Sequence, residues 1–282
     1  MIFWIASYPK SGNTWLRSLL SSYYFSKDGF FDQKLLEHIG QFPEKKYFIG
    51  FDYDSSIITD TSKFWISAQK RINQDNKLSF FKTHNVLGSI NGNKFTDLKN
   101  TIGCIYIIRD PRNVITSLKN HYEIKDEEAL KFMINEKKFI YDYRSKNDYG
   151  DFQFISSWEK NYKSWYNQSK FPVKLIKYEN LYNNTFNVFK DLIEFIERTT
   201  NSKNDFDKKK AQNAIQSCSF EKLKKIEKKD GFSESILSKS GSKKIPFFHL
   251  GPANNWKKIL SKEFQIELNL IFNKNLKELD YI

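Results

Sequence analysis

The segment Tyr8–Trp15, with the sequence YPKSGNTW, gathers the residue types that bind an anion. Gly12 lets the backbone approach a ligand closely, and Lys10 brings a positive charge. An apolar run precedes the segment and a helical pattern follows it, so backbone N–H groups and the positive end of a helix dipole meet there. Further donors follow in the first helical turn, from Ser11, Asn13 and Thr14. The sequence therefore predicts a phosphate-binding loop.

A second candidate site is the pair Lys82 and His84 in the run FFKTH. Side chains two residues apart on a strand leave the same face, so both reach one reaction centre if the strand continues to His84. A neutral imidazole at that place could accept a proton from a hydroxyl group. Among the four histidines of the chain, His84 is the one placed for this role, because it follows an apolar run.

Arg109 and Ser117 form a third candidate site. Arg109 ends the apolar run Thr101–Ile108, and the carboxyl ends of buried strands are where α/β proteins bind ligands. Pro111 suits the first turn of a helix, and Ser117 lies two turns along that helix. The guanidinium fork and the hydroxyl would then face one anion. The alternative is a surface ion pair between Arg109 and Asp110.

A sheet has to position these side chains, and the sequence contains the strands for one. Residues 2–7 are apolar and β-favouring, and Asn13–Tyr24 carries apolar residues at helical spacing. Similar apolar runs, each followed by a polar turn and a plausible helix, are Leu78–Lys82, Thr101–Ile108 and Val173–Lys177. Such crossover connections produce parallel pairing. We expect a three-layer α/β fold with a central, mostly parallel β-sheet flanked by helices, similar to P-loop NTPases at its N-terminus.

The length of 282 residues suits one large α/β domain, and the sequence contains no internal repeat. We therefore expect a single domain over residues 1–282. The region Lys222–Lys244 is rich in Lys, Ser and Gly, which disfavours a fixed position in the core. We interpret residues 222–250 as a lid segment that orders when a ligand binds.

Composition narrows the cellular setting. A hydrophobic content of 39% and an aromatic content of 17% support a packed globule. The two cysteines, Cys104 and Cys218, form neither a disulfide framework nor a metal-binding pattern, so a reducing compartment fits best. No stretch approaches the roughly 20 apolar residues that cross a bilayer, and the N-terminus lacks the pattern of a signal peptide. We expect a cytoplasmic protein without a transmembrane segment.

The net charge of +13 indicates an anionic partner and leaves several function classes open. A P-loop nucleotide kinase is one alternative, but Lys10 precedes Gly12 instead of following it, so the Walker A pattern is not met. A second acidic strand end that could hold Mg²⁺ is also missing. A basic nucleic-acid-binding protein is the other alternative, but no recognised nucleic-acid motif is present. We expect neither a bound metal nor a nucleic-acid partner.

The loop YPKSGNTW resembles the donor loop YPKSGTTW of the cytosolic-type sulfotransferases and differs from it at Asn13. That family has a P-loop-like fold and transfers a sulfuryl group from 3′-phosphoadenosine 5′-phosphosulfate (PAPS) to an acceptor hydroxyl. The resemblance implies PAPS as the donor and adenosine 3′,5′-bisphosphate (PAP) as the product. It assigns the 5′-phosphosulfate to Lys10, Ser11, Gly12, Asn13, Thr14 and Trp15.

Two further segments resemble the family's signatures for the 3′-phosphate. The run Ile107–Val114, taken with Ser117, resembles the second signature, so the resemblance implies that Arg109 and Ser117 bind this group. The stretch from residue 246 to residue 257 resembles the terminal signature and retains Gly251. It departs from the family at two positions, because His249 and Leu250 stand where two cations are expected. Either lysines of the lid compensate, namely Lys239, Lys243 or Lys244, or the affinity for the donor is lower.

The resemblance also assigns the adenine. Tyr178 in KYENL resembles the tyrosine that meets this ring. Cys218-Ser219-Phe220 aligns with a Thr-Ser-Phe element that lines the same ring, so Cys218 is expected beside it and Phe220 is expected to stack on it.

The expected reaction is an in-line transfer in which the resemblance makes His84 the general base. The sulfuryl group carries less negative charge than a phosphoryl group, so lysines can neutralise the leaving phosphate without a divalent metal. Lys10 and Lys82 are the candidates for this role. The acceptor stays open between a small alcohol or phenol and a glycan, because the residues that would choose it lie in the weakly patterned stretches Phe25–Phe64 and Asp126–Trp158. No pattern in the sequence indicates an oligomeric state.

Overall fold

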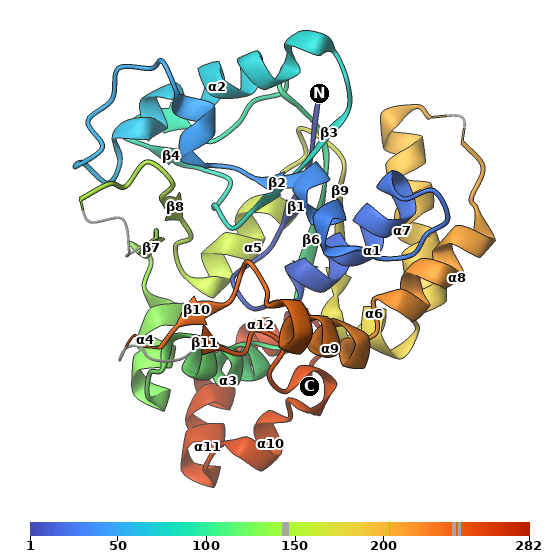
Figure 1. The fold of residues 1–282 in the computed structure, drawn as a ribbon. Coiled ribbons are helices and arrows are strands. Elements are labelled where there is room, and N and C mark those ends of the chain that lie inside the picture. The colour runs from blue at the N-terminus through green and yellow to red at the C-terminus, as the bar shows by residue number, and fades with distance from the viewer. Residues whose placement is uncertain (143–146, 203, 239–240, 242–243) are drawn as a thin grey trace.

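The computed structural model describes residues 1–142, 147–202, 204–238, 241 and 244–282 (Figure 1). A five-stranded sheet with the strand order β2-β3-β1-β6-β9 lies at the centre, and every neighbouring pair in it is parallel. The strands are β1 (Ile2–Ala6), β2 (Ile39–Gln41), β3 (Ser79–Thr83), β6 (Thr101–Ile108) and β9 (Val173–Lys177). The predicted α/β fold with a parallel sheet is confirmed.

The central strands are buried on both faces. All five residues of β1 are inaccessible to solvent, and seven of the eight residues of β6 are buried. Alternate side chains leave opposite faces of a strand, so Phe3 and Ile5 enter one apolar core while Trp4 enters the other. Continuous apolar runs of this kind are typical of strands covered by helices on both sides.

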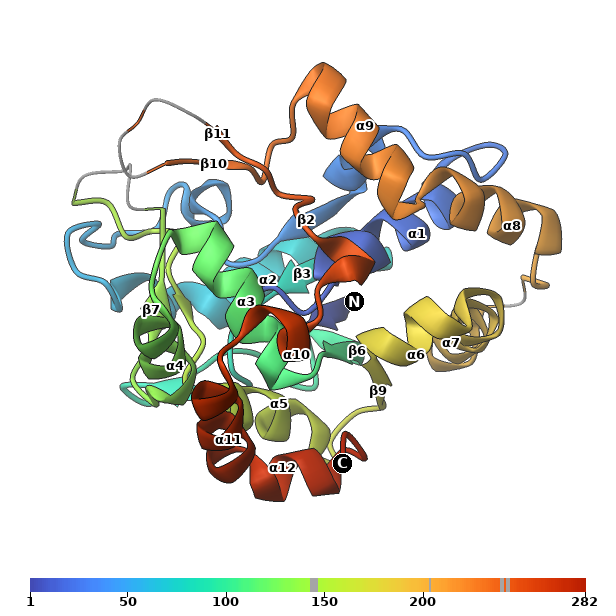
Figure 2. The same cartoon turned by 90° about the horizontal axis from the view of Figure 1, so that it is seen from below.

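Helices form the two outer layers (Figure 2). One layer packs on the Phe3 side and consists of α1 (Asn13–Phe25), α6 (Tyr178–Asn183), α7 (Thr185–Thr200) and α8 (Lys208–Ser217). The other layer packs on the Trp4 side and consists of α2 (Trp65–Ile72), α3 (Pro111–Tyr122), α4 (Asp126–Ile134), α5 (Trp158–Tyr166), α10 (Trp256–Ile259), α11 (Lys262–Ile271) and α12 (Asn273–Glu278). No helix within the described residues combines the length and the apolar character that a bilayer crossing needs.

Shorter elements complete the described chain. Three antiparallel pairs are β4 (Ser89–Ile90) with β5 (Asn93–Lys94), β7 (Phe139–Ile140) with β8 (Gln153–Phe154), and β10 (Ile236–Leu237) with β11 (Lys244–Ile245). Short 3-10 helices cover Gln33–His38, Lys45–Phe48, Asp60–Phe64, Asn73–Asp75 and Gly251–Ala253.

The segment 222–250 belongs to a third apolar cluster. It includes most of α9 (Phe220–Asp230), and Leu223, Phe232 and Phe248 pack together against Leu36. The composition of the segment does not show this, because lysines and serines separate the apolar residues in sequence. The described part of the segment is therefore packed against the rest of the domain. Lys239 and Lys243 lie outside the described residues.

Two details of the sheet differ from the sequence expectations. Strand β2 was not predicted, because three residues with the sequence IGQ are too short and too polar to form a recognisable strand pattern. Strand β3 ends at Thr83, so His84 follows the strand instead of continuing it. Lys82 and His84 nevertheless line the same cavity.

Candidate active site

The loop between β1 and α1 has the backbone of an anion-binding turn. Gly12 has φ 98° and is the N-cap of α1, and Lys10 has φ 67°, which is uncommon for a residue with a side chain. A Cβ atom at Gly12 would lie 2.5 Å from Cδ2 of Tyr178. Glycine is therefore required for the loop to pack against this ring.

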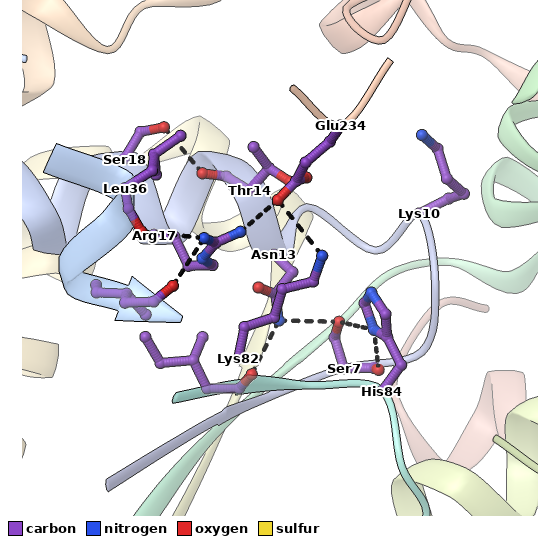
Figure 3. Close-up of polar contacts among 12 residues, drawn as sticks. Ser7, Lys10, Asn13, Thr14, Arg17, Ser18, Leu36, Lys82, His84 and Glu234 are labelled. Carbon is purple, nitrogen blue, oxygen red and sulfur yellow. Dashed lines mark hydrogen bonds and ion pairs between the residues drawn. The ribbon is translucent and has the colours of Figure 1, made fainter. Parts of the chain in front are cut away.

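The side chains of Asn13 and Ser11 are not free to donate into the cavity as expected. The Asn13 amide donates to the carbonyl oxygen of Ile5 at 3.0 Å and to Oγ of Ser7 at 3.1 Å (Figure 3). Both of its amide hydrogens are thus used to tie α1 to β1, and the expected side-chain contact of Asn13 with a ligand needs correction. Ser11 is fully buried, and its hydroxyl has no hydrogen-bond partner among the described residues.

His84 is buried and has a defined tautomer. Its Nδ1 lies 2.8 Å from the carbonyl oxygen of Ser7. A carbonyl oxygen can only accept, so Nδ1 carries the hydrogen and Nε2 is the basic atom. Burial, followed by the charge of Lys82, lowers the pKa of His84 to about 3. The imidazole is therefore neutral at pH 7.

The backbone around His84 is fixed from two sides. Its N–H donates to Oε1 of Gln153 at 2.7 Å, and its carbonyl oxygen accepts from Nδ2 of Asn161 at 2.9 Å. These two residues and Ser7 position the imidazole, and sequence analysis did not single them out. Gln153 and Asn161 lie near α5, about 70 residues further along the chain, so no local pattern connects them with His84.

The two candidate lysines lie in different surroundings. Lys82 is 8% exposed, and its Nζ lies 3.4 Å from Oε1 of Glu234. Lys10 places Nζ 4.0 Å from the centroid of the Phe247 ring and 3.4 Å from Nδ1 of His121. Burial lowers the pKa of Lys82 and lowers that of Lys10 to about 7. An added anion would favour the charged form of both side chains.

Arg109 does not form the surface ion pair with Asp110 that was the alternative interpretation. Asp110 instead pairs with Arg112 at 2.7 Å and caps α3. Arg109 lies with Cζ 4.2 Å from the centroid of the Tyr178 ring and donates from Nη2 to the carbonyl oxygen of Gly251 at 3.3 Å. Its Nε is buried and has no hydrogen-bond partner among the described residues. The guanidinium therefore has donor capacity left for a ligand.

Ser117 lies on α3 and is joined to the C-terminal segment. Its Oγ accepts from Nδ2 of Asn254 at 3.0 Å, and Asn254 also bonds the carbonyl oxygen of Asn113 and the hydroxyl of Thr116. Because Ser117 accepts in this contact, its own hydroxyl hydrogen stays available. Asn254 thus holds the segment that contains Gly251 against α3.

Aromatic rings of Trp15, Tyr178 and Phe220 line part of the cavity. Trp15 and Tyr178 meet edge to face, with centroids 5.6 Å apart. A Cβ atom at Gly251 would lie 2.2 Å from Cε2 of Phe220, so glycine is required for this close approach. Cys218 lies next to Trp15, because its carbonyl oxygen accepts from Nε1 of Trp15 at 3.0 Å. It is the C-cap of α8, and its side chain is fully buried against α1 with Sγ 3.6 Å from Oγ of Ser22. Cys218 is therefore outside the cavity lining, which corrects the prediction that it lines the adenine site.

One cavity of about 420 Å³ joins these groups. The predicted site residues that line it are Lys10, Gly12, Asn13, Thr14, Trp15, Lys82, His84, Arg109, Ser117, Tyr178, Phe220, His249 and Gly251. Ser11 and Cys218 do not line it. In the part of the chain that the structure describes, no group of three or more His, Cys, Asp or Glu side chains could hold a metal ion.

Two charged residues of the site were missed by sequence analysis. Glu234 reaches the phosphate loop from the segment after α9, and Lys224 on α9 donates from Nζ to the carbonyl oxygen of His249 at 3.3 Å. His249 itself is exposed at the rim. Lys224 is therefore a cation next to the position where the family signature has Arg and Lys. Of the three lysines expected to compensate, Lys244 is exposed in β11 and does not line the cavity, and Lys239 and Lys243 lie outside the described residues.

A parallel sheet whose first strand leads into a phosphate loop, with a neutral histidine after the neighbouring strand, defines a group-transfer enzyme of P-loop-like architecture. Residues 2–280 match the sulfotransferase domain family. The chain belongs to this family, as the loop YPKSGNTW predicted.

Curated relatives agree with this assignment. Luciferin sulfotransferase of Photinus pyralis is 23% identical over 277 residues, which cover 94% of this chain and 69% of the relative. Cytosolic sulfotransferase 16 of Arabidopsis thaliana is 23% identical over 283 residues, which cover 98% of this chain and 76% of the relative.

Solved structures share the fold. Mouse sulfotransferase SULT7A1 complexed with PAP superimposes with a TM-score of 0.58 at 17% identity, covering 98% of this chain and 84% of the other. Retinol dehydratase in complex with androsterone and inactive cofactor PAP gives a TM-score of 0.56 at 16% identity, with coverages of 98% and 80%. At these identities the likeness establishes the fold.

Proposed function

We propose that this protein transfers the sulfuryl group of PAPS to the hydroxyl group of a small alcohol or phenol, without a metal ion. The observation that carries the proposal is the geometry of His84. Its Nδ1 is held by the Ser7 carbonyl at 2.8 Å, which leaves Nε2 as the basic atom, and His84 lines the cavity that the phosphate loop also lines. A neutral base beside an anion-binding loop is the arrangement that attack by a hydroxyl on a bound sulfuryl donor requires.

The cavity fits the donor. Arg109 lines the cavity and keeps a buried Nε that has no hydrogen-bond partner among the described residues, so its guanidinium can still donate to a ligand anion. The 5′-phosphosulfate is assigned to the loop and the 3′-phosphate to Arg109 and Ser117, as the family resemblance implies. The rings of Tyr178 and Phe220 would hold the adenine between these two ends. The names of two related structures support this proposal, because each contains PAP.

The residues near the loop remove the proton of the acceptor hydroxyl and neutralise the charge of the leaving phosphate. The donor supplies a sulfuryl group attached to a phosphate that can leave. His84 takes the proton of the acceptor hydroxyl at Nε2 as the new O–S bond forms and the S–O bond to the 5′-phosphate breaks. Lys10 and Lys82 neutralise the charge that develops on the leaving phosphate. Nδ1 keeps its hydrogen and continues to donate it to the carbonyl oxygen of Ser7, and this hydrogen bond stabilises the imidazolium.

A small acceptor is favoured over a glycan. The lining of the cavity includes Gln153, which contacts His84, together with Tyr122, Ile140 and Phe247, so this set is mostly aromatic and apolar with one amide. The whole cavity is about 420 Å³ and has to hold the donor as well, so the space left suits a small molecule. Luciferin sulfotransferase and retinol dehydratase are named after small molecules, which supports the same class here.

We also propose a cytoplasmic location, a single domain and a lid role for residues 222–250. Cys104 and Cys218 are both free and buried, which suits a reducing compartment. One relative is named as cytosolic. The lid role is supported by Phe247, Phe248 and Glu234, which line the cavity from this segment.

The test is transfer of labelled sulfur from PAPS in the presence of EDTA to a panel of acceptors: 4-nitrophenol, an aliphatic alcohol and a sulfatable glycan. We expect PAP release that depends on the acceptor, together with a labelled product from the phenol or the alcohol. Labelling of the glycan alone would contradict the proposed acceptor class. Failure to release PAP with every acceptor would contradict the proposed reaction.

A further inference from the structure

The carboxylate of Glu234 lies inside the phosphate-loop end of the cavity. Its Oε2 accepts from Oγ1 of Thr14 at 2.6 Å, and its Oε1 pairs with Nη1 of Arg17 at 2.5 Å (Figure 3). The same Oε1 lies 3.4 Å from Nζ of Lys82. Glu234 comes from the segment between α9 and β10, 220 residues after Thr14 in sequence.

Glu234 is held there as an anion. Burial alone would raise the pKa of its carboxyl group, but Lys82, Arg17 and the Thr14 hydroxyl hold that pKa well below its usual range. The side chain is 22% exposed, so these interactions are only partly screened by water. A charged carboxylate in this environment binds as a phosphate oxygen would, because its partners are a hydroxyl and two cations.

The contacts of Glu234 are the contacts that a donor needs. A threonine hydroxyl has one hydrogen, and the hydrogen of Thr14 is donated to Glu234, so Thr14 has none to donate to a phosphate at the same time. Lys82 is one of the two lysines that would neutralise the leaving phosphate. A phosphosulfate placed against the carboxylate would also meet a like charge, which disfavours binding.

Arg17 has a different position from Thr14 and Lys82. Its Nη2 donates to the carbonyl oxygens of Leu36 and Ile39 at 3.3 and 2.8 Å, so the guanidinium is fixed to the domain. Its Nε is buried and has no hydrogen-bond partner among the described residues. Arg17 can therefore keep its ion pair with the Glu234 carboxylate when Thr14 and Lys82 are released.

We propose that Glu234 is an internal competitor of the donor: it occupies the phosphosulfate subsite of the donor-free protein, and the donor displaces it from Thr14 and Lys82. This inference rests on the proposed function, because it takes the loop as the phosphosulfate subsite. The carboxylate keeps Thr14 and Lys82 paired while the site is empty. It also couples donor binding to movement of the segment that carries Glu234.

The first test measures PAP binding by calorimetry to the full chain, to Glu234→Gln and to Asp230→Asn. Asp230 is an exposed acid at the end of α9, so Asp230→Asn removes the same charge from the same region without reaching the loop. We expect Glu234→Gln to bind PAP about tenfold more tightly or better, and Asp230→Asn to bind it as the wild type does. Adenosine 3′-monophosphate, which lacks the 5′-phosphate, should bind the wild type and Glu234→Gln equally.

A structural role of Glu234 predicts other results. If Glu234 braces the loop permanently, Glu234→Gln binds PAP equally or more weakly, and this outcome would overturn the proposal. Glu234→Ala repeats the test without a side-chain amide, and the melting temperature of each variant shows whether it is folded. Failure of PAP to bind any of the proteins, wild type included, would instead contradict the donor site of the proposed function and the inference with it.

A crystal structure with PAP separates displacement from a simple loss of negative charge. The proposal predicts that Oγ1 of Thr14 bonds an oxygen of the 5′-phosphate, and that Glu234 no longer contacts Thr14 or Lys82. Retention of the Thr14–Glu234 hydrogen bond beside bound PAP would overturn it, even if Glu234→Gln binds PAP more tightly.

Discussion

The two ends of the cavity are built differently. At the loop end, His84 is hydrogen-bonded to Ser7, and Lys82 and Arg17 are both paired with Glu234. At the nucleoside end, Arg109 lies against the ring of Tyr178 with an Nε that no described residue pairs, and His249 is exposed at the rim. On the proposal above, the donor has to replace Glu234 at the loop end, where His84 stays fixed, whereas the other end adds contacts to the ligand.

This difference separates catalysis from affinity. Groups that are pre-organised and buried stabilise charge that develops in the reaction, because they need little rearrangement. Groups with unused donors at the rim contribute to binding of the ground state as much as of the transition state. Substitution of the catalytic candidate His84 should thus change turnover, whereas substitutions of Glu234 and of residues at the nucleoside end should change donor affinity.

The largest effect is expected for His84→Gln. The variant removes the base, so turnover should fall about 10²- to 10⁴-fold, while the dissociation constant for PAP stays within about threefold of the wild type. Turnover is measured with an acceptor that the panel identifies, and PAP binding is measured by calorimetry. His38→Gln, at an exposed position in another part of the chain, is the control. Normal turnover in His84→Gln would remove its role as base.

Arg109→Ala should have an intermediate effect, on the affinity for PAP rather than on turnover. Loss of a charge-assisted contact costs about 1.5–3 kcal/mol, which corresponds to about 10- to 150-fold weaker PAP binding. Adenosine 5′-monophosphate should bind the variant and the wild type more alike, because it lacks the 3′-phosphate. If Arg109→Ala weakened both ligands equally, the assignment of Arg109 to the 3′-phosphate would have to be abandoned.

Lys224→Gln should have a smaller effect. Lys224 is exposed and contacts the carbonyl oxygen of His249, so its charge is screened by water. We expect PAP to bind about two- to fivefold more weakly than to the wild type, and this difference should become smaller as salt is added. Lys228→Gln, at another exposed position of α9, provides the matched control. Equal effects of the two substitutions would show that net charge, and not a local contact, is responsible.

The pKa values of His84 and His249 report how far water reaches the two ends of the cavity. Burial lowers the pKa of His84 to about 3, so its imidazole should stay neutral as the pH falls from 7 to about 5. The pKa of His249 is also lowered by burial, but its exposed position predicts that it takes up a proton at a higher pH than His84. An NMR titration of the donor-free protein measures both, with the signals assigned through His84→Gln. Protonation of His84 between pH 6 and 7 would contradict the claim that the loop end of the cavity is shielded from water.

The sequence predicted the parts of the site that have a local chemical pattern. The phosphate loop lies between a strand and a helix within one short segment. Lys82 lies on a strand that contains Phe80 and Phe81, and Arg109 follows the apolar strand β6. These features depend on neighbouring residues, so they can be recognised without tertiary information. The same holds for Pro111, which begins α3 as expected.

The rest of the site depends on contacts between distant segments. Glu234 lies in a polar stretch without periodicity, and its role arises from packing of Phe232 and Leu223 under the same segment. Asn13 belongs to the loop pattern, but its amide turns inward because Ile5 and Ser7 offer acceptors there. A motif names a position in the chain, whereas packing decides which way its side chain points.

The measurement that tests the account most directly is calorimetric titration of the wild-type protein with PAP in EDTA, repeated with adenosine 5′-monophosphate. The account predicts metal-free binding of PAP and much weaker binding of the monophosphate, because Arg109 and Ser117 contact the 3′-phosphate. Absence of PAP binding, or equal affinity for the two nucleotides, would contradict the assignment of this cavity to the sulfuryl donor.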